Sequence, residues 1–139
     1  MTCGLRLYAA DMPLTEDDLA LYERARGASA NAHVPYSRFP VGAALRTGGG
    51  QVYTGANVEN ASFGLTCCAE RTAIFTAVSA GHSDLAAIAV HADADSAPPC
   101  GACRQVMAEF APQLRVIWRR DGELVASSLA DLLPDGFRL

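Results

Sequence analysis

The sequence predicts an α/β fold, a three-layer α/β/α sandwich around a mixed sheet of five strands. Segments with helical and strand character alternate along the chain in the order α-ββ-α-β-α-ββ-α, which is typical of a sheet covered by helices. Residues 85–92, LAAIAVHA, form a short continuous apolar run, as expected of a central strand that is buried on both faces. No long linker, low-complexity tract or internal repeat interrupts the 139 residues, so we expect a single domain over residues 1–139.

The first three predicted elements lie before residue 60. The segment LTEDDLALYERA opens a helix that we expect to run to about residue 32. Thr15 is a suitable N-cap, and Asp18 stands at the N3 position of a capping box. Residues 39–58, FPVGAALRTGGGQVYTGANV, then predict two strands on either side of a glycine-rich turn.

The second half of the chain predicts the remaining helices and strands. Residues 68–81, CAERTAIFTAVSAG, are apolar on most faces and end in a glycine, as a buried helix does. Residues 98–112, PPCGACRQVMAEFAP, predict a helix between prolines. Residues 114–128, LRVIWRRDGELVASS, predict two strands joined by an Asp-Gly turn, and residues 129–137 predict a short final helix with a tail.

Composition and charge exclude several classes of function. The net charge is −4, and all eleven basic residues are arginine, so lysine chemistry such as Schiff-base formation is excluded and a nucleic-acid partner is not expected. No apolar run reaches the length of a membrane span, and the N-terminus lacks the pattern of a signal peptide. We therefore expect no membrane partner and a cytoplasmic location.

Five cysteines suggest metal binding or catalysis in such a reducing compartment, where disulfides are rare. They are Cys3, Cys67, Cys68, Cys100 and Cys103. The C-x-x-C pair at 100–103 fits either a redox motif or half of a zinc site. A thioredoxin-like motif would be expected near the start of the chain, whereas this pair follows three predicted strands and two further cysteines. We therefore predict zinc.

Glu70 identifies the third zinc ligand. Alone, a glutamate in the first turn of a helix often only complements the helix dipole. Together, however, Cys68-Ala69-Glu70 and Pro99-Cys100-Gly101-Ala102-Cys103 match the [H/C]-x-E…P-C-x-x-C pattern of zinc-dependent nucleobase deaminases, in which the glutamate moves protons. This register predicts Cys68, Cys100 and Cys103 as ligands and leaves a fourth position for water. Cys67 is then a packing or supporting thiol, and Cys3 is incidental.

With these blocks in place, the sequence resembles the small homotetrameric cytidine deaminases from about Leu19 to Phe137. VPYSRFPVGAAL and TGANVENASFG resemble two further blocks of that family, and three cysteine ligands are typical of its tetrameric branch. The resemblance implies one Zn²⁺ per subunit, a homotetramer with active sites completed across subunits, and a nucleoside substrate.

The resemblance also implies roles for individual residues. Asn57 and Glu59 would hydrogen-bond the ribose hydroxyls with Val58 between them, Phe39 would stack near the pyrimidine, and Phe137 would reach a neighbouring active site. The chain departs from the family where Phe63 replaces a common tyrosine and where the tail ends in FRL.

Simpler interpretations exist for each of these residues. Phe39 is compatible with a core position, Asn57 with a turn residue that caps backbone groups, and Glu59 with a solvated charge. Three thiolates would leave the zinc site with a formal charge of −1, so we expect helix N-termini to offset it, with Arg71 and Arg104 donating to sulfur. For Arg104, a surface arginine is an equally good interpretation.

The expected reaction is the hydrolytic deamination of cytidine and 2′-deoxycytidine in pyrimidine salvage, with Glu70 as the proton carrier. Alternatives are a deaminase of another substrate, such as blasticidin or a base in RNA, and a non-catalytic zinc-stabilised binding module. A C-x-x-C redox protein is a further alternative that would contain no zinc.

Overall fold

The computed structural model describes residues 11–139, and these contain the predicted elements in the predicted order. The helices are α1 (Glu16–Ala28), α2 (Ala69–Ser79), α3 (Gly101–Phe110) and α4 (Leu129–Leu132), with 3₁₀ turns at Ser29–Asn31 and Phe63–Leu65. The strands are β1 (Val41–Thr47), β2 (Val52–Ala56), β3 (Leu85–Ala92), β4 (Arg115–Arg120) and β5 (Glu123–Ser128). Among these elements, no helix is long and apolar enough to cross a membrane.

The five strands form one mixed sheet in the order β2-β1-β3-β4-β5. Strands β3 and β4 are parallel, and every other neighbouring pair is antiparallel. Both β2 and β3 run antiparallel to β1, so they point in the same direction, and Ala56 of β2 and His91 of β3 lie opposite the same residue, Gly42. The segments that lead to α2 and α3 therefore leave the sheet at the same edge.

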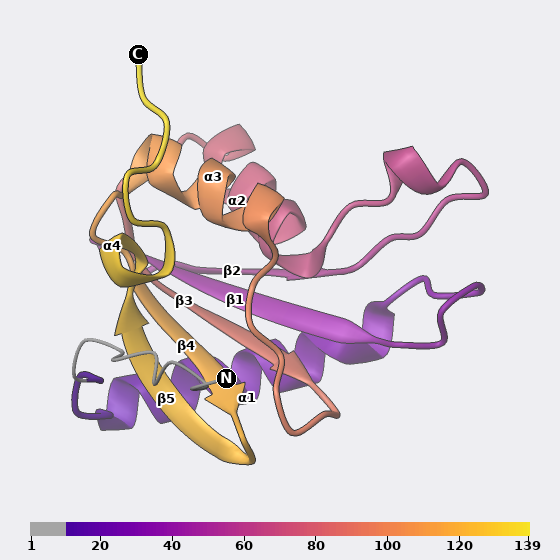
Figure 1. The fold of residues 1–139 in the computed structure, drawn as a ribbon, viewed down its shortest axis with the longest axis horizontal. Helices are drawn as coiled ribbons and strands as arrows, with labels where there is room; N and C mark the ends of the chain where they lie inside the picture. Colours follow the sequence, from indigo (N-terminus) through magenta and orange to yellow (C-terminus); the bar gives the residue numbers. More distant parts are fainter. Residues whose placement is uncertain (1–10) are drawn as a thin grey trace, which may run out of the picture.

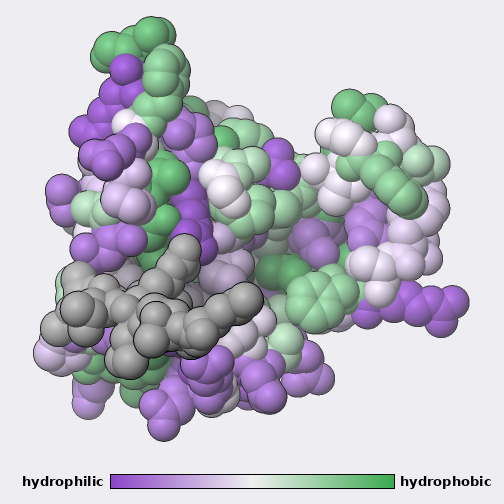
Figure 2. Space-filling model, viewed as in Figure 1, coloured by the Kyte–Doolittle hydropathy of each residue, from purple (hydrophilic) through white to green (hydrophobic). Residues whose placement is uncertain are grey.

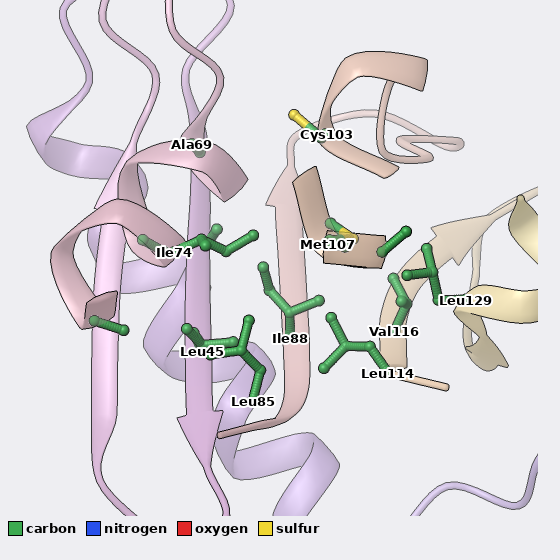
Figure 3. Close-up of a cluster of buried hydrophobic side chains, with 14 of the residues drawn as sticks. Leu45, Ala69, Ile74, Leu85, Ile88, Cys103, Met107, Leu114, Val116 and Leu129 are labelled. Atoms are coloured by element: carbon green, nitrogen blue, oxygen red, sulfur yellow. The ribbon is translucent and has the colours of Figure 1, made fainter. Parts of the chain in front are cut away.

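Helices cover both faces of this sheet, which confirms the three-layer prediction (Figure 1). Helix α1 lies on one face, while α2, α3 and α4 lie on the other. Successive residues of a strand point to opposite faces; Leu45 accordingly belongs to the cluster on the side of α2 and α3, whereas Ala44 packs with α1. Figure 3 shows Ile74 of α2 and Met107 of α3 directed toward the sheet.

The start of α1 is fixed by side chains that the sequence identifies. Asp18 N donates to Thr15 Oγ1 at 3.2 Å, and Thr15 N donates to Asp18 Oδ2 at 2.8 Å, which completes the predicted capping box. Arg115 of β4 also donates to both carboxylate oxygens of the fully buried Asp18, at 2.9 and 2.6 Å. The helix is thus both capped and anchored to the sheet.

Two strand glycines let the helices approach the sheet closely. A Cβ at Gly42 would clash with the Ala25 carbonyl oxygen of α1, and one at Gly55 would clash with the Ala73 amide nitrogen and lie 2.6 Å from the Ala69 carbonyl oxygen of α2. A side chain at either position would push a helix away from the sheet. Gly55 therefore sets the distance between the sheet and α2, the helix whose N-cap is Cys68.

Candidate active site

Three cysteine sulfur atoms meet where α2 and α3 begin. Cys68 is the N-cap of α2, Cys100 is the N-cap of α3, and Cys103 lies in the first turn of α3. The Sγ atoms of Cys68 and Cys100 are 3.8 Å apart, those of Cys100 and Cys103 are 3.4 Å apart, and all three lie within 4.8 Å of one another. Cys103 is buried beside the core, and its sulfur lies at the rim of the cluster in Figure 3.

This spacing fits a zinc ion. Zinc–sulfur bonds of about 2.3 Å in a tetrahedron place neighbouring sulfurs about 3.8 Å apart. The sulfur–sulfur separations of 3.8 and 3.4 Å in the structure are close to that value. Among the described residues the cluster contains three such ligand groups, one fewer than a closed structural zinc site uses. The donors present suit a zinc centre with one position left for a water molecule or substrate.

The environment favours negative charge on Cys68. Its pKa is lowered to about 5, first by the hydrogen bond from Cys103 and then, against the opposing effect of burial, by Arg71 and Cys100. The Nη2 atom of Arg71 lies 3.5 Å from Cys68 Sγ and 3.4 Å from the Thr66 carbonyl oxygen. Because Cys103 donates its proton toward Cys68, the pKa of Cys103 is raised. A metal cation that replaces the proton between Cys103 and Cys68 would therefore bind a Cys68 sulfur whose surroundings already favour the thiolate form.

Glu70 lies in the first turn of α2 and is 4% exposed. Its pKa is raised to about 7, mainly by burial and also by the nearby charge of Cys68, while a backbone hydrogen bond, Cys103 and Arg71 act in the opposite direction. A carboxyl group with a pKa near neutrality can both accept and donate a proton at physiological pH. This is the property required of a proton carrier.

Cys67 is separate from the sulfur cluster. Its sulfur accepts from Thr72 Oγ1 at 3.6 Å, and its backbone pairs with Val58 through two hydrogen bonds of 2.9 Å. These contacts match the supporting position expected of Cys67, whereas Cys3 lies outside the described residues. None of the four described cysteines forms a disulfide.

Arg104 has different partners from those expected. Its Nε donates to the Pro99 carbonyl oxygen at 2.8 Å, and its Nη1 donates to the Leu132 carbonyl oxygen at 2.7 Å. Neither acceptor is a sulfur, so these contacts do not support the expected donation to the metal ligands. Leu132 ends α4, where carbonyl groups lack partners within the helix, and this makes its oxygen a favourable acceptor.

The residues expected to bind ribose lie on the segment between β2 and α2. The Asn57 side chain accepts from Val41 N at 2.9 Å and donates to the Phe39 carbonyl oxygen at 2.9 Å. It therefore caps backbone groups, as its simpler interpretation requires. Glu59 Oε1 accepts from the amides of Tyr36 and Ser37 at 2.9 and 3.1 Å.

The hydrogen bonds made by Glu59 also keep it ionised. Bonds from Ser37, assisted by the amide of Tyr36, hold the pKa of the Glu59 carboxyl below its usual value. A fixed carboxylate with one oxygen engaged by amides keeps acceptor capacity for hydroxyl groups. Glu59 is therefore held in place by the loop before β1 rather than freely solvated.

The two aromatic candidates are both accessible. Phe39 is 44% exposed, so its interpretation as a core residue is wrong. Phe137 is 71% exposed on the C-terminal tail, where Gln105 Nε2 donates to its carbonyl oxygen at 3.0 Å. Within the chain, the Phe137 ring is therefore free to meet another surface.

Sequence analysis did not identify the supporting role of the loop at residues 33–38. His33 N donates to the Asn57 carbonyl oxygen at 3.0 Å, and Glu59 N donates to the His33 carbonyl oxygen at 2.9 Å. With Tyr36 and Ser37, His33 makes this loop a backbone scaffold for residues 57–59. Contacts made by backbone groups do not require particular residue types, so the sequence carries no pattern that predicts them. Only the run VPYSRF pointed to this loop.

The sandwich, the three-sulfur cluster and the buried carboxyl group together define a zinc-binding hydrolase of the deaminase class. Residues 15–118 match the family model described as the cytidine and deoxycytidylate deaminase zinc-binding region. The chain belongs to this family.

Curated and solved relatives cover most of the chain. It is 51% identical over 124 residues to a cytidine deaminase of Halalkalibacterium halodurans, which covers 87% of this chain and 94% of that protein. It is 46% identical to a cytidine deaminase of Mycobacterium tuberculosis over 113 residues, 81% of this chain and 83% of the relative. The crystal structure of cytidine deaminase from Burkholderia pseudomallei superposes with a TM-score of 0.82 at 50% identity, covering 89% of this chain and all of that chain.

Proposed function

We propose that this protein hydrolyses the amino group of cytidine and 2′-deoxycytidine, releasing ammonia and the corresponding uridine nucleoside. The observation that carries this proposal is the buried Glu70 beside three convergent sulfurs. Such a pair of features serves a hydrolytic reaction, and the similar proteins are named cytidine deaminases. A role in pyrimidine salvage in the cytoplasm is consistent with this activity.

Cys68, Cys100 and Cys103 would hold one Zn²⁺ per chain. When bound there, zinc would act as a Lewis acid that lowers the pKa of water toward neutrality. Glu70 would take the proton of that water and deliver it to N3 of the pyrimidine, which makes C4 electrophilic. After the water oxygen attacks C4, Glu70 would take the second proton from that oxygen and pass it to the departing amine, so that ammonia leaves as the C4 carbonyl forms. Its pKa of about 7 suits both steps, since the same group must accept and release a proton.

Arg71 would offset part of the negative charge of the three thiolates. Its guanidinium is within 3.5 Å of Cys68 Sγ, and the N-termini of α2 and α3 add positive potential at the same place. This compensation would preserve the ability of the metal to polarise water.

Substrate would be held beside the sulfur cluster by the segment Asn57–Glu59. Glu59, kept ionised by its amide partners, would accept hydrogen bonds from ribose hydroxyls. Asn57 would donate the second proton of its side-chain amide to the substrate while its other side-chain hydrogen bonds hold the start of β1. Val58 would set the spacing between Asn57 and Glu59. The exposed ring of Phe39 would lie against the pyrimidine.

We further propose that the active form is a homotetramer whose sites are completed across subunits. Apolar side chains that a monomer would leave in water occur on the loop before α2 and on the tail, as Figure 2 shows. Phe63, Leu65 and Phe137 are each more than 70% exposed. Exposure of this kind is typical of surfaces buried in an assembly, and Phe137 would reach a neighbouring site.

The direct test is an ultraviolet assay of cytidine deamination with and without a zinc chelator. We expect turnover that the chelator abolishes and that added zinc restores. Glu70→Ala should remain folded and zinc-loaded but lose about 10²–10⁴-fold in rate, whereas Glu109→Ala, an exposed glutamate on α3, should not. Zinc binding without turnover of cytidine would favour a deaminase of another substrate, such as blasticidin or a base in RNA, or a non-catalytic zinc-stabilised binding module. Disulfide reduction without zinc would favour a redox protein.

A further inference from the structure

Arg104 joins two backbone segments that lie on either side of α3. One acceptor, the Pro99 carbonyl oxygen, belongs to the residue directly before Cys100. The other, the Leu132 carbonyl oxygen, ends α4 and lies 28 residues further along the chain than Arg104. The two distances of 2.8 and 2.7 Å are short for N–H···O hydrogen bonds, as expected when the donor is charged.

The segment held by Arg104 carries the ligand that has the least packing. Cys103 is fully buried and Cys68 is half-buried, whereas Cys100 is exposed. Cys100 follows an irregular segment that links β3 to α3. The sulfur of Cys100 therefore depends on its backbone for its position, and the carbonyl group before it is the one that Arg104 holds.

The second contact keeps Arg104 itself in place. The Arg104 guanidinium spans to Leu132, and the planar arrangement of its donors restricts its rotation once both oxygens are engaged. Pro99 is among the fully buried residues, so its carbonyl group would lose a partner in a poorly solvated place if Arg104 were removed.

We propose that Arg104 is a positioning residue that fixes the Pro99 carbonyl group and, through it, the Cys100 sulfur for metal binding, with the end of α4 as its support. This inference rests on the zinc site of the proposed function. It differs from charge compensation, because Arg104 acts on the backbone and not on a sulfur.

The test measures how fast zinc leaves the purified holoprotein for a chromogenic chelator. We expect Arg104→Ala to release zinc about tenfold faster, the effect of losing one charged hydrogen bond. Arg104→Lys keeps the charge and can donate to one of the two carbonyl groups, so it should release zinc at a rate between those of the wild type and Arg104→Ala. Gln105→Ala removes the neighbouring contact with the Phe137 carbonyl and should release zinc at the original rate.

A general loss of stability is distinguished by a control on the other face of the sheet. Leu21→Ala truncates a buried side chain of the α1 cluster, and it should lower the melting temperature without a comparable change in zinc release. Cobalt-substituted Arg104→Ala should also show altered sulfur-to-metal charge-transfer bands, which a remote packing defect would leave unchanged. If Arg104→Ala fails to fold, the rate of zinc release and the cobalt spectrum of Arg104→Lys test the positioning role instead.

Zinc release at the original rate with an unchanged cobalt spectrum would overturn the positioning role. Equal acceleration in Leu21→Ala would overturn it as well. Neither readout uses a substrate, so failure of cytidine to react would count against the proposed activity and not against this inference. A wild-type protein that binds no zinc would overturn both.

Discussion

Neighbouring residues at the start of α2 have pKa shifts of opposite sign. The thiol of Cys68 is shifted toward the ionised form by hydrogen bonds from Cys103 and Arg71, while the carboxyl group of Glu70 is shifted toward the neutral form by burial. Both effects come from one place in the fold, where a helix N-terminus meets the core. The same location therefore favours a metal ligand and a proton carrier two residues apart.

The adjacent cysteines provide a prediction at the level of single residues. Cys68→Ala should lose most of the bound zinc, because two sulfurs remain of the three that converge. Cys67→Ala should retain zinc, since its sulfur contacts Thr72 instead. Metal analysis of the two purified variants would check this, and equal zinc loss in both would contradict the assignment.

Helices and strands supply the geometry that brings the site together. Strands β2 and β3 end at one edge because both are antiparallel to β1, and each leads to a helix whose N-cap is one of the convergent cysteines. The position of α2 depends in turn on the absence of a side chain at Gly55.

Gly55→Ala should therefore damage both stability and the site. The added methyl group would overlap the Ala73 amide of α2, and overpacking of this kind costs about 1–3 kcal/mol. Gly27→Ala is the matched control, because a Cβ there meets nothing within 4 Å and favours the helix. The melting temperature and the zinc content should fall for Gly55→Ala and not for Gly27→Ala. Equal melting temperatures for the two variants would rule out the proposed crowding.

The anchor of α1 predicts a pH-dependent contribution to stability. Burial raises the pKa of Asp18, but hydrogen bonds from Arg115 and Thr15 outweigh it and leave the pKa below its ordinary value of 3.8. A lowered acid pKa stabilises the fold above about pH 3.8, and this contribution disappears as the pH falls through the folded-state pKa. Asp18→Asn should lower the free energy of unfolding by about 2 kcal/mol at neutral pH.

Urea unfolding between pH 7 and about pH 2 would measure this difference, because the contribution is lost below pH 3.8. The gap between wild type and Asp18→Asn should narrow in acid, whereas Asp17→Asn, an exposed neighbour in the same helical turn, should match wild type throughout. A gap that stayed constant with pH would contradict the assignment to ionised Asp18.

The order of the elements, the five strands and the different roles of Cys68 and Cys67 could be predicted from the sequence. These depend on local patterns: hydrophobic periodicity, helix-capping residues and motif spacing. The sequence did not predict the partners of Arg104 or the loop that supports Glu59. In both cases the partners are backbone groups, and those of Leu132, Tyr36 and Ser37 lie far along the chain from the side chains that they contact; a backbone carbonyl or amide gives no signal in the residue type. Such contacts follow only from the packed fold.

At the scale of the whole molecule, the surface keeps large apolar side chains exposed that the core does not cover. The core is closed on both faces of the sheet, but large apolar side chains remain exposed on the loop before α2 and on the tail. Phe63 and Leu65 lie on the same segment between β2 and α2 as the proposed substrate residues 57–59, so burial of this loop would link assembly to activity in the proposed tetramer.

Sedimentation should therefore give a mass of about 58 kDa, four chains of 14.6 kDa. Phe63→Asp combined with Leu65→Asp should give smaller species with reduced turnover, because two buried charges would oppose association. Leu19→Asp, an exposed leucine on α1, should leave the mass unchanged. A wild-type monomer with full activity would refute the assembly proposal.

The order of the proposed zinc ligands along the chain has a consequence during synthesis. Cys68 emerges from the ribosome 35 residues before Cys103 (103 − 68), an interval of about 2–7 s at ordinary elongation rates. Until then α3 (Gly101–Phe110) is incomplete, whereas Arg71, which lies 3.5 Å from Cys68 Sγ in the folded chain, has already been synthesised. Ribosome-bound chains stalled at increasing lengths should accordingly take up zinc only after α3 has cleared the exit tunnel, which makes metal loading one of the last events in the maturation of each subunit.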